Sequence, residues 1–213
     1  MTARRLAIGL AIGACVILAA MVALSAASGA TQELHEWYRA PDAYAAGLVA
    51  HPAALRALFG LDLAFLTLYA LFFTTLAQHL HRVAPSWLVW VGLGALLGTA
   101  VLDIVEDHHI VALLERALAG HPLDDDSIAA QHVISQTKFS LSYIGLVAFG
   151  LAIPRTRPIA WLLAAVLTAG TLATAIASLA APADLRASLD AGRWVGFFLG
   201  FGLAALWLRR ESD

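Results

Sequence analysis

Apolar residues in this chain gather into six runs, which are separated by short stretches rich in proline, glycine and charged residues. A helix needs about 20 apolar residues to cross a hydrocarbon core about 30 Å thick, and each run is close to that length except the last, which is short. We therefore predict an all-α integral membrane protein with one transmembrane domain, residues 1–213. Its six spans are expected at residues 6–27, 56–78, 87–106, 133–153, 159–181 and 193–208.

Arginines predict how these spans are oriented. If the N-terminus lies inside, the inner segments hold seven arginines and two carboxylates. These arginines are Arg4, Arg5, Arg82, Arg155, Arg157, Arg209 and Arg210. Cytoplasmic loops of membrane proteins carry an excess of Lys and Arg, so both termini are predicted to be cytoplasmic. Compact loops and spans rich in alanine and leucine favour the plasma membrane of a bacterium, that is, its inner membrane.

The first run has a second interpretation. Its basic start and the small residues near Ala27 and Ala30 are also typical of a signal peptide, and Cys15 follows a weak lipoprotein-like pattern. However, the apolar stretch from Leu6 to Leu24 is longer than a signal core, and the residues after Cys15 stay apolar. We interpret this run as an uncleaved membrane anchor.

Composition agrees with a multi-pass membrane protein. Hydrophobic residues make up 61% of the chain and charged residues 13%, with a mean hydropathy of +0.78, which is far from the values of soluble domains. A single cysteine excludes an internal disulfide and any multi-cysteine metal site. Because no basic patch with interleaved aromatic residues occurs, the expected partner is the lipid bilayer and not a nucleic acid.

The stretch "VLDIVEDHHI" at residues 101–110 breaks the apolar pattern of the third run. At a rise of about 1.5 Å per residue, Asp103 lies about 24 Å from the inner end of its span. By the same measure, Asp62 in the second span and Lys138 in the fourth lie about 9 Å from the outer face. Three helices therefore bring Asp62, Asp103 and Lys138 to one level, in the outer quarter of the bilayer.

On its own helix, each of these three residues shares one face with residues at helical spacing. Lys138 belongs to a polar stripe, and a charge facing lipid costs about 2.5–3.5 kcal/mol even on the lenient scale. We expect Lys138 to turn inward and pair with Asp103, Asp62 or both. The stripes are Asp62, Leu66, Tyr69 and Phe73; Thr99, Asp103, Glu106 and Ile110; and Gln131, Ser135, Lys138, Ser142 and Gly145.

Beyond Asp103, the residues Glu106, Asp107, His108 and His109 are predicted to form the rim of an outer mouth. Glu106 and His109 have the Glu-x-x-His spacing that directs two side chains to a metal from one helix face. Together with His132 at the start of the facing helix, they are candidate ligands for a divalent zinc, iron or manganese ion. Solvated interfacial histidines are the alternative interpretation.

Helix ends and small residues add detail. We expect the third helix to continue to Ala119, to stop at Gly120, and to be followed by a helix capped by Asp126 or Ser127. Small residues predict close helix packing, and a homo-oligomer is plausible because six short spans leave little room for a path. These residues are Gly9 and Gly13, Gly94 and Gly98, and Gly192, Gly196 and Gly200.

Three functions are compatible with this pattern. The first is proton, ion or small-solute handling by the buried Asp62, Asp103 and Lys138 cluster, because ionisable groups inside membranes are often functional. The second is a membrane-embedded metal-dependent enzyme open to the outer leaflet, with Asp103 as its base. The third is a structural or assembly subunit whose ion pair only joins helices.

Overall fold

The computed structural model describes residues 3–180 and 186–210, and within them every regular element is a helix, as the all-α prediction requires. Two long helices of the first half, α1 (Ala3–Ser28) and α3 (Pro52–Leu80), are joined by the short η1 (Glu33–His35) and α2 (Pro41–Ala50). The remaining elements are α4 (Ser86–Leu118), α5 (Asp125–Ala152), α6 (Pro158–Ala165), η2 (Val166–Gly170), α7 (Thr171–Ala180) and α8 (Arg186–Arg210).

Four helical segments in the described part of the chain are long and apolar enough to cross a membrane: α1, α3, α4 and the continuous stretch Pro158–Ala180. They coincide with the first, second, third and fifth predicted spans, although residue 181, the predicted end of the fifth, lies outside the described residues. Helices α5 and α8 coincide with the fourth and sixth predicted spans. They are less apolar because α5 carries a polar stripe and α8 carries arginines and glycines. The count of six spans therefore stays a prediction.

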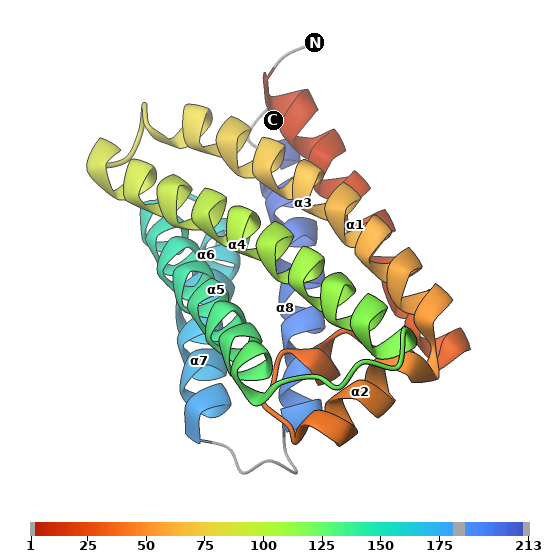
Figure 1. The fold of residues 1–213 in the computed structure, drawn as a ribbon. Helices are drawn as coiled ribbons and strands as arrows, with labels where there is room; N and C mark the ends of the chain where they lie inside the picture. The colour runs from red at the N-terminus through yellow and green to blue at the C-terminus, as the bar shows by residue number, and fades with distance from the viewer. Residues whose placement is uncertain (1–2, 181–185, 211–213) are drawn as a thin grey trace.

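The long helices run up and down one bundle (Figure 1). The start of α1 and the end of α8 lie at one end of it, and α2 lies at the opposite end, near the connection between α4 and α5. The covering segment, which we define as η1 and α2 with their flanking loops (residues 29–51), therefore caps the end that is distant from both termini.

Local sequence explains where several helices begin and end. Proline is the first residue of α2, α3 and α6, a position at which its missing N–H and fixed φ suit a helix. Helix α4 ends at Leu118 and is followed by Gly120 with φ +75°, as expected from the sequence. The cap of α5 differs from the prediction: Asp124, and not Asp126 or Ser127, accepts a 2.8 Å hydrogen bond from the Ser127 backbone N–H.

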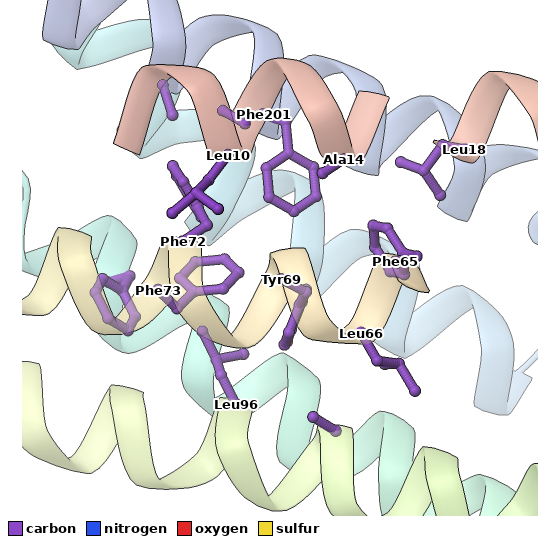
Figure 2. Close-up of a cluster of buried hydrophobic side chains, with 14 of the residues drawn as sticks. Leu10, Ala14, Leu18, Phe65, Leu66, Tyr69, Phe72, Phe73, Leu96 and Phe201 are labelled. Carbon is purple, nitrogen blue, oxygen red and sulfur yellow. The ribbon is translucent and has the colours of Figure 1, made fainter. Parts of the chain in front are cut away.

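Aromatic side chains form the centre of the bundle where α1, α3, α4 and α8 meet (Figure 2). On α3, Tyr69 and Phe73 pack with ring centroids 4.8 Å apart, and Phe72 and Phe201 of α8 are 5.1 Å apart. Such aromatic pairs add about 0.5–1.5 kcal/mol each to the free energy of area burial. The predicted inner face of the second span is confirmed, because all four of its residues are buried.

Close helix contact occurs at some of the glycines emphasised by the sequence spacing, since a Cβ on Gly13 or Gly98 would lie 3.3 Å from a leucine of a neighbouring helix, but the closest contact is at another glycine. Between α4 and α5, a Cβ on Gly145 would lie 2.5 Å from Leu96 Cγ and 3.0 Å from the carbonyl oxygen of Gly92. By contrast, no described heavy atom lies within 4 Å of a Cβ built on Gly196, where the sequence predicts tight packing. The correction has a physical reason: spacing shows which glycines share a face but not whether that face meets a helix or a cavity.

We expect Gly145→Ala to destabilise the protein by about 1–3 kcal/mol, because the added methyl overlaps the fully buried Leu96. Gly94→Ala is the matched control on α4, where an added Cβ meets no described atom within 4 Å. Denaturant unfolding of the two purified variants should separate them. Equal stability of both variants would contradict this account of the α4–α5 contact.

Candidate functional site

Lys138 is the centre of a buried charged cluster between α4 and α5. Its side chain is 7% exposed, and its Nζ lies 2.7 Å from Asp103 Oδ1 and also forms an ion pair with Glu106. Asp103 and Glu106 are three residues apart on α4, so both side chains are on the face that meets α5. One buried cation is thus shared by two carboxyl groups.

Glu106 is held by α5 from several directions. Its Oε1 accepts hydrogen bonds from Gln131 Nε2, at 3.1 Å, and from the Ser135 hydroxyl. Gln131, Ser135 and Lys138 are successive members of the polar stripe predicted for this helix, and all are buried. The residues of this stripe are therefore hydrogen-bond and ion-pair partners of the α4 carboxylates, so their polar groups do not face lipid.

Three aspartates form a second part of the cluster. One carboxyl oxygen from each of Asp62, Asp103 and Asp107 lies within 4.8 Å of the others. Asp62 and Asp107 are 4% and 8% exposed, so little water screens their mutual repulsion. Carboxylates this close repel one another, and the single ammonium group on Asp103 offsets only part of that repulsion.

The predicted outer rim is partly wrong. Glu106 and Asp107 are buried inside the cluster, because α4 turns both toward its neighbours and the covering segment lies over this end. His108 is exposed, with Nδ1 2.8 Å from the carbonyl oxygen of Ile104 in its own helix. His109 is half-buried, with Nδ1 2.8 Å from Gln131 Oε1.

The three metal ligands suggested by the sequence do not converge. Glu106 faces Lys138, His109 faces Gln131, and His132 Nδ1 lies 3.1 Å from the backbone carbonyl of Glu36. The described residues instead bring together an oxygen-only set, Asp62, Asp103 and Asp107. Such a set suits magnesium, calcium or manganese better than zinc, and the ammonium group on Asp103 opposes any cation there.

Glu36 and Arg193 also belong to this site, and sequence reasoning missed both. Arg193 of α8 lies 2.7 Å from Glu36 Oε2, with side chains 12% and 6% exposed. The neighbouring Trp194 donates a 2.6 Å hydrogen bond to Glu33 Oε1. The sequence signal was the pair of carboxylates in "ELHEW", in a loop at the same end as an arginine that starts a span.

Burial gives Glu36 an unusual titration. It raises the pKa of Glu36 from 4.5 to about 7, although the Arg193 and Lys138 charges act in the opposite direction. His35, beside it, has its pKa lowered to about 4 by burial and by Arg39. The covering segment therefore changes charge near neutral pH through Glu36, while His35 stays uncharged.

We expect Glu36 to make stability fall as the pH rises. Between pH 4.5 and about 7 the folded protein keeps a proton that the unfolded chain releases, so raising the pH favours unfolding by up to about 3 kcal/mol. Glu36→Gln should lose this contribution. Thermal unfolding of the wild type and of Glu36→Gln at pH 5 and pH 8 measures this contribution. His35 is present in both proteins, so its own effect on stability is the same in each. Parallel pH profiles would contradict the assignment.

These groups surround a small cavity of about 70 Å³. Asp62, Asp103 and Lys138 line its inner side, and Glu36 and Arg193 line the side toward the covering segment. A space of this size admits water, whose share of liquid volume is about 30 Å³. The cluster thus has room for exchangeable solvent, and the Asp62, Asp103 and Lys138 level predicted from depth is the wall of one cavity.

Comparisons of the chain with protein-family models, with curated proteins and with solved structures find no match.

Proposed function

We propose that this chain is a multi-pass protein of the bacterial inner membrane, with six spans, cytoplasmic termini and the charged cluster toward the outer face. Four segments have the length and hydropathy of spans. The start of α1 and the end of α8 share one end of the bundle, in agreement with an even number of passes. Arginine-rich segments at that end support a cytoplasmic location for it.

Within that topology, the proposed function is proton handling, in which protons cross the membrane by way of the charged cluster. The observation that carries it is the close approach of Asp62, Asp103 and Asp107 beside a single lysine. Such a group is expected to exchange a proton readily, because each added negative charge raises the energy of the others in a medium of low dielectric. Asp62 is the best carrier, since it is the most buried of the three aspartates, at 4% exposed, and since Asp103 is already paired with Lys138.

Lys138 has a different role in this proposal. Its ion pairs with Asp103 and Glu106 fix one positive charge at the cluster, so that Asp62 and Asp107 carry the variable proton. Protons reach the cluster through the small cavity, whose outer side is lined by Gln32, Glu33 and Glu36.

The direct test is proton flux in vesicles containing the purified protein and a trapped pH-sensitive dye. A potassium gradient with valinomycin sets the voltage, and we expect flux above that of protein-free vesicles. No excess flux would overturn the proposal in favour of a structural subunit. Stoichiometric magnesium, calcium or manganese in the purified protein would instead assign the three aspartates to a metal.

Cysteine labelling tests the topology. Single cysteines at Asp42 and Asp125 should react in intact cells with a membrane-impermeant maleimide, because both positions lie at the end proposed to face outside. A cysteine at Thr156, between α5 and α6, should react only after the cells are opened. Labelling of position 156 in intact cells would reverse the orientation.

A further inference from the structure

A second and larger cavity lies beside the charged cluster. It has a volume of about 260 Å³ and is lined by α3, α5, the α6–η2–α7 segment and α8. Its walls are mainly apolar side chains, among them Phe73, Leu146, Leu167 and Phe201. Nothing in the proton-handling proposal uses this space.

The two cavities are adjacent. Four residues, Phe139, Ser142, Arg193 and Phe197, line both of them. Together the spaces reach the lower end of the range of about 300–1,000 Å³ that is usual for small-molecule sites. The combined site is amphipathic, with charged and polar groups at one end and an apolar chamber at the other.

Backbone features keep the apolar chamber open. No described heavy atom lies within 4 Å of a Cβ built on Gly192 or Gly196, so two successive turns of α8 leave room where side chains would otherwise fill it. Across the cavity, the π-helical turn η2 interrupts the helix that runs from Pro158 to Ala180, and its Val166, Leu167 and Gly170 line the space. Single π-helical turns inside α-helices occur often at functional sites.

The chamber reaches the surface of the bundle beside α8. Val195 and Leu199 line it and are nevertheless 56% and 48% exposed. Since this surface belongs to a proposed span, its opening faces acyl chains. A molecule that enters here comes from the membrane.

The charges at the polar end of the combined site determine which head group a bound molecule can have. Both cations there already have carboxylate partners at 2.7 Å, Lys138 with Asp103 and Arg193 with Glu36. Among the described residues that line the small cavity, Gln32 Oε1 is a buried acceptor without a hydrogen-bond donor, and Asp62 adds a buried carboxyl group that has no ion pair. A buried acceptor without a donor costs about 1–3 kcal/mol, which a donor on the ligand would offset.

We propose that the two cavities bind a single-chain membrane amphiphile whose head donates hydrogen bonds, a hydroxyl or an amine. The head lies by Asp62 and Gln32, and the chain lies between η2 and α8. An anionic head is excluded by the surplus of carboxyl groups around the small cavity. This inference extends the proposed function, because it names a ligand of the same cluster. The evidence for the chamber is independent of that function, since it is the geometry of η2 and α8.

Photolabelling of the full-length protein in vesicles tests the proposal, with a dodecanol that carries a diazirine in its chain as the probe. We expect adducts on η2 and α8, at residues such as Leu167 and Phe201. Unlabelled dodecanol and dodecylamine should compete, whereas laurate should not. Adducts confined to lipid-facing residues such as Val101, which is 60% exposed, would overturn the site, and competition by laurate would overturn the head-group assignment.

Gly196→Leu should abolish the η2 and α8 adducts by filling the chamber. Gly94→Leu is the matched control, since it adds the same side chain at an exposed helical position outside both cavities, and should label like the wild type. Equal labelling of the two variants contradicts the inference. In the wild type, proton flux without adducts on η2 and α8 would overturn this inference alone, whereas adducts without proton flux would overturn the proton-handling proposal alone.

Discussion

Replacing Lys138 with methionine is expected to destabilise the bundle by about 3–5 kcal/mol, the usual effect of removing one partner of a buried ion pair. The substitution keeps the length of the side chain but leaves Asp103 and Glu106 without their shared cation. The triple variant Lys138→Met, Asp103→Asn, Glu106→Gln should recover most of the loss, because it leaves no stranded charge. The free energy of unfolding in mixed micelles measures both effects.

A surface pair provides the control. Arg56 and Glu115 lie 2.6 Å apart with side chains 46% and 56% exposed, so Arg56→Met should change stability by about 1 kcal/mol or less. An equally small effect of Lys138→Met would show that burial does not strengthen the Lys138 contacts. Failure of the triple variant to recover stability would show that Asp103 and Glu106 are not its partners in solution.

Asp62→Asn is expected to abolish proton flux and reduce it to the level of protein-free vesicles. The amide keeps the shape of the carboxyl group but cannot release a proton, and Asp62 is the most buried of the three aspartates. Because one charge is removed from a crowded acidic group, stability should be unchanged or increased. If Asp62 had only a structural role, Asp62→Asn would not lose proton flux while its stability stayed intact.

Asp126→Asn is the matched control, because Asp126 is exposed at the same end of the bundle. Its flux should equal that of the wild type. If Asp62→Asn also retained full flux, Asp62 would not carry the proton, and the comparison with Asp107→Asn would then decide whether any of the three aspartates does.

The helices themselves followed from local pattern. Apolar runs, prolines at first helical positions and the glycine after α4 predicted most bounds of the long helices to within a few residues, because each is a property of neighbouring residues. The exceptions are the start of α8, which lies at Arg186 and not at 193, and the short helices η1 and α2, which were not predicted. The same regularity explains why Asp62, Asp103 and Lys138 line one cavity: a helix rises by a constant amount per residue, so sequence position translates into depth.

The rotation of each helix about its axis and the path of the loops could not be predicted from the sequence. From their position along α4, Glu106 and Asp107 were predicted to form a solvated rim, yet both turn inward. The packing of α4 against α3 and α5 decides this orientation. His109 and His132 likewise have the spacing of metal ligands but face Gln131 and Glu36. Spacing defines a face, and only the neighbouring helices decide what that face meets.

By itself the sequence determined that this chain is helical, where most helices begin and end, and which polar residues share a depth. These features depend on interactions within about one helical turn or on summed hydropathy. Only the tertiary structure decided that Glu36 closes over the cluster with Arg193, and that Gly196 borders an open chamber. The first joins residues 157 positions apart and the second depends on how α8 sits against η2, and such contacts are set by the packing of the whole bundle.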